Sequence, residues 1–435
     1  MILIYSQNTS ARLEFICKLI FFDILGIQYK ITTNTIEFLD YNNAKINYSN
    51  TDFDDAVEIK PHHLLFEKGI NRQNITVTLW NDLPVFFQKP SVSELPFDIF
   101  AASFYLVSRY EEYLTFIPDI HNRFSAKQSL AYKNGFLEKP IVNQWVMLLK
   151  NILEQKFPEI KFPEKKYNFI STIDVDNAYA YLNKGFLRTF AATFLSILKF
   201  NFNDNVRRYK VLLKKSNDPF NTFNYIRNIH DKYNIKPVYF FLVGKYGKYD
   251  KNISVKNSNF QKLIKDLSVK FEIGIHPSYN SNKDIEILKN EKNNLSEIIN
   301  KEIKKSRNHF LKICFPSTYQ NLLKSGITEE HSMAYASCVG FRASICTPFK
   351  FYDLALEKET ELTVYPFAIM DATLKYYLKY DINDAIDKTS EIINEIKKVN
   401  GTFISLWHNE SLSEIREWKN WKKVFEKMIQ LAIND

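Results

Sequence analysis

The most informative segment of the sequence is Tyr167-Asn-Phe-Ile-Ser-Thr-Ile-Asp-Val-Asp176. It begins as a short apolar run after a break rich in Pro and Lys, which predicts a buried β-strand. Residues two apart on a strand point to the same side, so the carboxylates of Asp174 and Asp176 would enter one site. Two acids at the end of a buried strand are costly unless they bind a cation or take part in catalysis. Taken alone, the stretch fits a strand followed by a solvated turn or a helix cap equally well.

The second half of the chain alternates predicted strands with predicted helices, which favours a parallel sheet or barrel. In parallel α/β barrels the active site lies at the carboxyl ends of the strands. Each polar residue at such an end has a structural explanation by itself, as a strand terminator, a core histidine, a helix cap or a turn residue. Their shared position at five strand ends predicts one site. The predicted strands after the first are Lys236–Val243, Phe271–His276, Ser306–Leu311, Val339–Ala343, Leu362–Asp371 and Thr402–His408. The polar residues are Asp174, Asp176, His276, Arg307, His309, Asp371 and His408.

These residue types are those of metal-assisted hydrolysis. One carboxylate and two imidazoles suit a divalent catalytic metal that keeps positions open for water and substrate. A second carboxylate beside the metal can accept the proton of the water, and a separate histidine can protonate a leaving group.

The first 160 residues predict a separate and smaller α+β domain. Pro158 and Pro163 interrupt the chain after it, and we place a boundary there, with domains at residues 1–160 and 165–435. The periodicity of apolar residues predicts the elements of the first domain. They include a strand at Ile2–Tyr5, a hairpin of Ile27–Ile31 with Ile36–Leu39, and helices at Phe97–Tyr113 and Ile141–Phe157.

Composition narrows the classes of protein. The chain has 435 residues and a net charge of +9, but Lys is spread over most of it, which indicates general solubility, and no nucleic-acid-binding motif is present. The four cysteines form no C-x-x-C pair and fit reduced core residues. The N-terminus lacks the features of a signal peptide, and no apolar stretch has the length of a membrane span. We therefore expect a cytoplasmic protein.

Four motifs resemble those of polysaccharide deacetylases of the NodB-homology type, in carbohydrate esterase family four. Thr172-Ile-Asp174-Val-Asp176 resembles the first motif, T-F-D-D-G, and Glu272-Ile-Gly-Ile-His276-Pro resembles the metal-histidine motif. Ser306-Arg307-Asn-His309 stands where the arginine motif belongs, and Leu406-Trp-His408 resembles the closing L-x-H motif. Gly340-Phe-Arg-Ala343 and residues 97–113 resemble a branch in which a domain of unknown function precedes the deacetylase.

The resemblance implies a deformed (β/α) barrel that removes an acetyl group, most naturally N-acetyl, from a sugar of a polysaccharide or surface-glycan precursor. It implies a divalent metal such as Zn²⁺ held by Asp176, His276 and His309. Asp174 would be the general base, oriented by Arg307. His408 would be the general acid, with Asp371 holding its imidazole.

The chain departs from the family at the second metal histidine, where it has Asn280. We expect His309 to replace that ligand. Two other functions remain open: a non-catalytic glycan-binding or scaffolding protein on a decayed barrel, and an amidohydrolase that acts on a small non-sugar amide. A general base and a general acid favour the enzyme, because binding alone needs neither.

Residues 184–215 carry an apolar stripe, Leu187, Phe190, Phe194 and Leu198, among many Lys and Arg residues. Such a basic amphipathic segment can lie on an anionic membrane surface. A helix packed on the body of the protein with a solvated basic face would explain the same pattern. Exposure of the stripe discriminates the two. The first alternative predicts peripheral membrane contact, near the inner face of a membrane.

Overall fold

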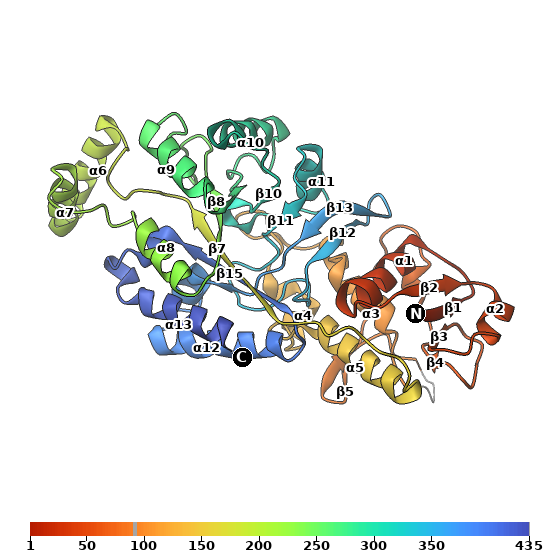
Figure 1. Ribbon diagram of the computed structural model, residues 1–435. Coiled ribbons are helices and arrows are strands. Elements are labelled where there is room, and N and C mark those ends of the chain that lie inside the picture. Colours follow the sequence, from red (N-terminus) through yellow and green to blue (C-terminus); the bar gives the residue numbers. More distant parts are fainter. Residues whose placement is uncertain (90–93, 435) are drawn as a thin grey trace.

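Two sheets organise the computed structural model, which describes residues 1–89 and 94–434. A nine-stranded sheet, in the order β12-β13-β11-β10-β9-β8-β7-β15-β14, forms the centre of the molecule, and a four-stranded sheet, β2-β1-β3-β4, lies at one end (Figure 1). A third, two-stranded sheet is formed by β5 and β6. The strands are β1 (Ile2–Ser6), β2 (Tyr29–Thr32), β3 (Lys45–Tyr48), β4 (Val57–Glu58), β5 (Thr78–Trp80), β6 (Leu83–Val85), β7 (Asn168–Val175), β8 (Val238–Phe241), β9 (Glu272–Ile275), β10 (Lys305–Ser306), β11 (Glu329–Glu330), β12 (Phe349–Asp353), β13 (Lys358–Val364), β14 (Ile369–Met370) and β15 (Thr402–His408).

Helices flank the central sheet on both sides. In Figure 1, α9 to α11 lie along one side and α12 and α13 along the other, while α6 and α7 stand at the end opposite the four-stranded sheet. The helices are α1 (Ala11–Cys17), α2 (Thr35–Leu39), α3 (Ile99–Val107), α4 (Leu130–Lys133), α5 (Ile141–Lys156), α6 (Phe186–Leu198), α7 (Phe202–Leu212), α8 (Phe223–Lys232), α9 (Ser258–Ser268), α10 (Ile285–Ile299), α11 (Ser317–Lys324), α12 (Ile382–Lys397) and α13 (Trp421–Ile433).

The central sheet is parallel except at one edge, which confirms the predicted mixed α/β class. Only β12 runs antiparallel to its neighbour, β13. β12 and β14 are the edge strands, and the described residues contain no hydrogen-bonded pairing between them. Strand pairing therefore establishes a parallel sheet with helices on both faces, but not a closed barrel.

Several predicted elements differ in the structure. The hairpin expected at residues 27–39 is wrong, because β2 pairs in parallel with β1 and the second segment is α2. Asn34 caps α2 by accepting hydrogen bonds from the N–H groups of Ile36 and Glu37, so a local side chain favours helix over strand. The single strand expected at 362–371 is two strands, β13 and β14, which lie at opposite parts of the sheet. The strand expected at Val339–Ala343 is absent from the structure, which describes these residues in full.

Residues 339–343 instead join the N-terminal region to the central sheet. Arg342 forms a buried ion pair with Glu112, and Arg109 pairs with the same carboxylate. The Nε atom of each arginine is 2.8 Å from Oε1 of Glu112. Gly340 has φ +110°, and a Cβ there would lie 2.4 Å from the carbonyl oxygen of Leu137. The backbone approaches too closely for any other residue. This stretch, read as a family signature, thus has a structural role.

The register of the parallel strands decides which residues meet at the carboxyl edge. Asp174 is level with His408 on β15, Phe241 on β8 is level with Ile275 on β9, and Ile275 is level with Ser306 on β10. The residue that follows each strand therefore stands in one row. Asp176, His276, Arg307 and Asp371 are each the first residue after β7, β9, β10 and β14, and His408 is the last residue of β15.

Among the described residues, no helix has both the length and the apolar character needed to cross a lipid bilayer.

Candidate metal and catalytic site

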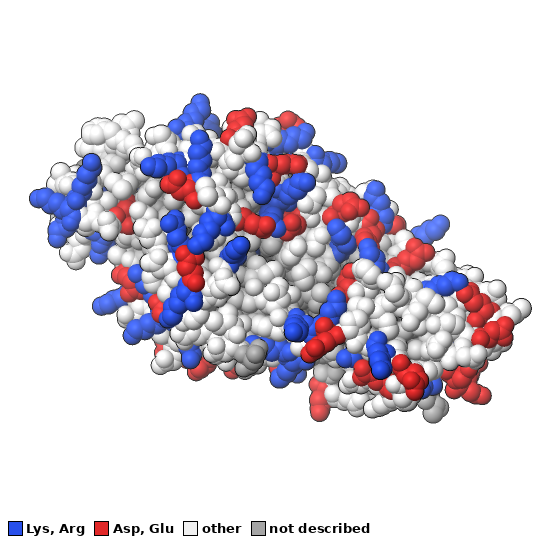
Figure 2. All heavy atoms as spheres, in the orientation of Figure 1, with Lys and Arg blue, Asp and Glu red and all other residues white. Residues whose placement is uncertain are grey.

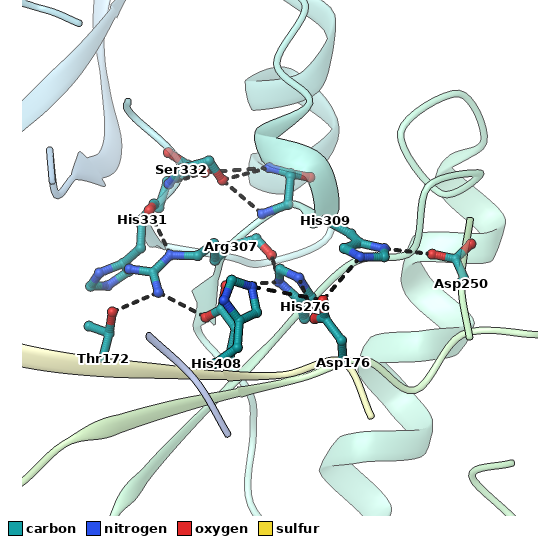
Figure 3. A network of polar contacts seen from close by, with 12 residues as sticks. Thr172, Asp176, Asp250, His276, Arg307, His309, His331, Ser332 and His408 are labelled. Atoms are coloured by element: carbon teal, nitrogen blue, oxygen red, sulfur yellow. Dashed lines mark hydrogen bonds and ion pairs between the residues drawn. The ribbon is translucent and has the colours of Figure 1, made fainter. Parts of the chain in front are cut away.

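Three predicted ligands converge at the carboxyl edge of the sheet. One donor atom from each of Asp176, His276 and His309 lies within 4.8 Å of the other two (Figure 3). Nε2 of His276 is 3.2 Å from Oδ1 of Asp176, and Nε2 of His309 is 3.3 Å from Oδ2 of the same carboxylate. His309 reaches the group from a turn of 3-10 helix, His309–Leu311, and not from the strand predicted for it.

Both imidazoles are oriented by a hydrogen bond from the other ring nitrogen. Nδ1 of His276 is 2.5 Å from the carbonyl oxygen of Arg307, which can only accept, so Nδ1 carries the proton. Nδ1 of His309 is 2.8 Å from Oδ1 of Asp250, and donates to it. Each Nε2 is thereby left facing Asp176. This is the usual support of histidine metal ligands, whose second N–H is donated to a carbonyl or carboxylate.

The donor set fits a divalent cation. Oδ1 of Asp176 is buried and accepts no hydrogen bond from the described residues. A buried carboxylate oxygen without a donor is costly, and a cation would satisfy it. One oxygen and two imidazole nitrogens are a common set for catalytic zinc and related ions.

Electrostatics in the group are strongly coupled. Burial opposes ionisation of Asp176, but the nearby imidazoles of His309 and His276 outweigh it and hold the pKa of Asp176 well below its usual value. Burial lowers the pKa of His309, whereas Asp176 and Asp250 raise it, and the pKa rises to about 9. Without a cation, His309 is therefore protonated at neutral pH. Its imidazolium then supplies the positive charge next to Asp176 that a bound cation would otherwise supply.

Asp174 lies next to this group, with Oδ2 at 3.9 Å from Nδ1 of His276, and is fixed by Arg307. Nη1 of Arg307 donates to Oδ1 of Asp174 at 2.8 Å and to Oγ1 of Thr172 at 2.7 Å, and Nε donates to the carbonyl oxygen of His331 at 2.9 Å. Arg307 is fully buried, with Phe240 against its guanidinium at 4.6 Å. A planar donor held by three acceptors is rigid, so Asp174 is fixed as well.

His408, level with Asp174 on the neighbouring strand, is fixed by Asp371. Nδ1 of His408 is 2.8 Å from Oδ1 of Asp371, and the backbone N–H of His408 donates to Oδ2 at 2.8 Å. Ser411 donates to the same carboxylate. Nε2 of His408 consequently faces the site, 3.8 Å from Oδ2 of Asp176. Burial lowers the pKa of His408, but Asp371, with further contributions from Asp176 and Asp174, raises it well above the usual value.

The structure thus brings together all seven residues predicted for the site: three around a common point, with Asp174–Arg307 and His408–Asp371 beside them. Asn280, which stands where the family has a second histidine, is exposed and forms part of a turn.

Sequence reasoning missed three supporting residues: Asp250, Thr172 and Ser411. Asp250 lies in the loop after β8, where no periodicity or motif marks it. It also accepts from the backbone N–H of Tyr279 at 3.0 Å, so it ties the loop after β9 to His309. Thr172 is two residues before Asp174 on the same strand, and the period of two could have identified it.

A polar cavity of about 340 Å³ adjoins the site. Asn177 and Glu410, which follow Asp176 and His408 closely in sequence, line it together with Tyr181, Tyr376 and Trp418. Burial, with the negative charge of Asp176, raises the pKa of Glu410 to about 7. Half-buried aromatic rings also pack beside His309. The ring centroid of Phe310 is 4.6 Å from that of His309, and the ring centroids of Tyr249 and Tyr279 are 5.5 and 5.4 Å from that of Phe310.

A family model matches the N-terminal region of the chain, and solved structures are similar to about 60% of the chain. Residues 2–158 match a family of unknown function, DUF7033. No curated protein matches the chain. Similar solved structures include a protein of Mycobacterium smegmatis described as a polysaccharide deacetylase (13% identity, 63% of this chain and 87% of that chain, TM-score 0.40). They also include the polysaccharide deacetylase Bc1974 of Bacillus cereus (11%, 59% and 88%, TM-score 0.28) and the Puue allantoinase (10%, 62% and 85%, TM-score 0.38). TM-scores this low do not bear on the chemistry, which depends on the side chains described above.

Proposed function

We propose that the chain is a metal-dependent hydrolase that removes an acetyl group, N-acetyl in the first place, from a sugar of a polysaccharide or surface-glycan precursor. The observation that carries the proposal is the set of groups that meet at the sheet edge. A ligand set of Asp176, His276 and His309 lies beside a carboxylate fixed by an arginine and an imidazole fixed by a carboxylate, which are level with each other on neighbouring strands. A site that only bound a glycan would need neither of the two flanking pairs.

Asp176, His276 and His309 would hold the cation, with zinc the first choice for one oxygen and two nitrogen donors. When bound, the cation supplies a Lewis acid for the acyl oxygen and for water. Asp250 and the carbonyl oxygen of Arg307 keep the ligand nitrogens of both histidines turned inward.

Asp174 is proposed as the general base. Its carboxylate accepts the proton of the attacking water, while Arg307 keeps it from rotating away. The water oxygen adds to the acetyl carbon, and the carbon–nitrogen bond then breaks.

His408 is proposed as the general acid. Against the effect of burial, Asp371 raises the pKa of His408 and so favours the protonated imidazole, whose Nε2–H can give a proton to the departing amine. Asp371 fixes the tautomer and stabilises the charge that His408 carries before the transfer. Acetate and a free amino sugar are the products.

The neighbouring cavity supports a sugar as substrate. Its volume and its mixture of polar groups with the rings of Tyr181, Tyr376 and Trp418 suit a polar ring compound more than an apolar acyl chain.

The test is acetate release from N-acetylated glucosamine oligomers by purified protein after addition of Zn²⁺, Co²⁺ or Mn²⁺. We expect release by the native chain and none by Asp176→Asn, with Asp387→Asn, an exposed aspartate of α12, as a matched control that keeps activity. Retained sugar binding without acetate release would favour a glycan-binding protein. Hydrolysis of small non-sugar amides alone would favour an amidohydrolase.

A further inference from the structure

The hairpin of α6 and α7 exposes apolar residues to solvent and turns mainly polar residues toward the protein. Eight apolar residues of α6 are exposed, among them Leu187 (80%), Phe190 (64%), Phe194 (55%) and Leu198 (58%). The opposite side of the same helix is half-buried and consists mainly of small or hydroxyl-bearing residues: Arg188, Thr189, Ala192, Thr193 and Ser196. A helix of a globular protein normally turns its apolar side inward, so α6 presents the reverse arrangement.

α7 repeats the pattern. Phe202, Val206, Tyr209 and Leu213 follow one another at helical spacing and are all exposed. The side that faces the protein is mostly polar, with buried Asp204, Asn205 and Arg208 beside Val211. Chance exposure of one residue is common, but two helices that both expose an apolar stripe form a patch that indicates a partner.

Polar contacts fix the hairpin in this orientation. Arg208 pairs with Asp204 at 2.9 Å and donates to Oγ1 of Thr193 on α6 at 3.1 Å. Tyr181 donates to Asp204 at 2.8 Å, and Arg416, after β15, pairs with the same carboxylate. Turning the apolar side inward would break these buried contacts, which is costly.

The charges around the patch are almost all positive. Residues 184–215 contain eight Lys or Arg and one acid, Asp204. Asp204 is buried and neutralised by Arg208 and Arg416, whereas Lys199, Lys210, Lys214 and Lys215 are exposed. Figure 2 shows an uncharged surface at the end of the molecule that holds α6, with Lys and Arg side chains beside it over α7.

We propose that the α6–α7 hairpin docks the protein on an anionic lipid bilayer. Phe and Leu side chains would enter the boundary between headgroups and acyl chains, while the lysines contact the acidic headgroups. The positive charge of the hairpin favours an anionic bilayer over a second copy of the chain as the partner. Two hairpins packed face to face would bring two sets of lysines together with no acidic residues to balance them. The acidic headgroups of a bilayer would balance these charges.

Docking there would also orient the candidate site. Lys184, Asp204 and Arg208 line the 340 Å³ cavity, together with Asn177 and Glu410, which follow the site residues Asp176 and His408 in sequence. The cavity would therefore lie close to the lipid surface, as suits a substrate attached to the membrane. The docking proposal goes beyond the reaction and holds whether or not the chain is a deacetylase.

The test is flotation of the full chain with vesicles of phosphatidylcholine alone or mixed with phosphatidylglycerol. We expect flotation only with the anionic vesicles, weakened by salt because headgroup attraction is screened. Phe190→Asp with Phe194→Asp, and separately Lys210→Glu with Lys214→Glu, should each weaken binding by at least about tenfold. Ile36→Asp with Leu356→Asp, two exposed apolar residues far from the hairpin in sequence, is the matched control and should float like the native chain.

The outcomes separate the alternatives. Absence of flotation with anionic vesicles would overturn the proposal, as would flotation that both hairpin variants retain. Light scattering in solution tests the remaining partner: a dimer that Phe190→Asp with Phe194→Asp converts to a monomer would show that the patch binds a second copy. Circular dichroism confirms that each variant is folded before its result is used.

Discussion

The carboxyl edge of the central sheet and the α6–α7 hairpin both bury polar groups, but they differ in where their apolar groups face. At the sheet edge, Asp174, Arg307 and Asp371 are fully or almost fully buried, and each is held by partners on neighbouring strands or loops. In the hairpin the polar groups are also turned inward, but the apolar groups are turned out to solvent. The first arrangement pre-organises charges for chemistry on a small molecule. The second leaves a surface that is complete only when something covers it.

The largest effects should come from the flanking pairs at the sheet edge. We expect Asp174→Asn and His408→Ala each to lower kcat by about 10²–10⁴-fold, because they remove the general base and the general acid. Bound metal, measured by atomic emission, should stay near the native level in both variants. Asp176→Asn should lose the metal together with the activity. Near-native kcat in both Asp174→Asn and His408→Ala would contradict the proposed mechanism.

Removal of Asp250 should have a smaller effect and should act on the metal. Asp250→Asn loses the carboxylate that accepts from Nδ1 of His309. Support of this kind contributes about 10–100-fold in metal affinity or activity, so we expect a loss in that range from a competition titration with a chelator. Asp387→Asn is again the control. An unchanged affinity would show that His309 is not a ligand.

Metal binding should depend on pH through His309. Its pKa of about 9 means that the imidazole is protonated below that pH, and a ligand must be neutral. Each ion bound near pH 7 should therefore release a proton, and affinity should rise by about tenfold per pH unit up to about pH 9. Calorimetry in two buffers with different ionisation enthalpies measures the proton release. Affinity that falls as pH rises over this range would contradict the assignment.

The hairpin should have the smallest effect on the isolated protein. Phe190→Asp with Phe194→Asp changes only exposed side chains, so the free energy of unfolding should stay within about 0.5 kcal/mol of the native value. Ile173→Ala, in the buried strand next to Asp174, should cost about 2–5 kcal/mol in the same urea titration. Activity on a water-soluble substrate should be native in the hairpin variant. A large loss of stability would show that the patch is covered within the chain itself.

Two features of the second half could be predicted from the sequence alone: the alternation of strands and helices, and the polar residues at five strand ends. Both are local: hydrophobic periodicity spans a few residues, and a polar residue that interrupts it marks where a buried strand ends. The same reasoning identified the apolar stripe of residues 184–215, because amphipathicity also depends only on spacing.

Which residues meet in space, and which side of each helix is exposed, depended on the tertiary structure. Strand order separated β13 from β14 and placed Asp371 beside His408, and the register aligned Asp176, His276 and Arg307 in one row. Asp250 entered the site from a loop that has no periodic signal, and the stripe of α6 was turned outward by buried contacts of Arg208 and Asp204. Each of these outcomes depends on contacts between residues far apart in the chain, whose free energies no local pattern contains.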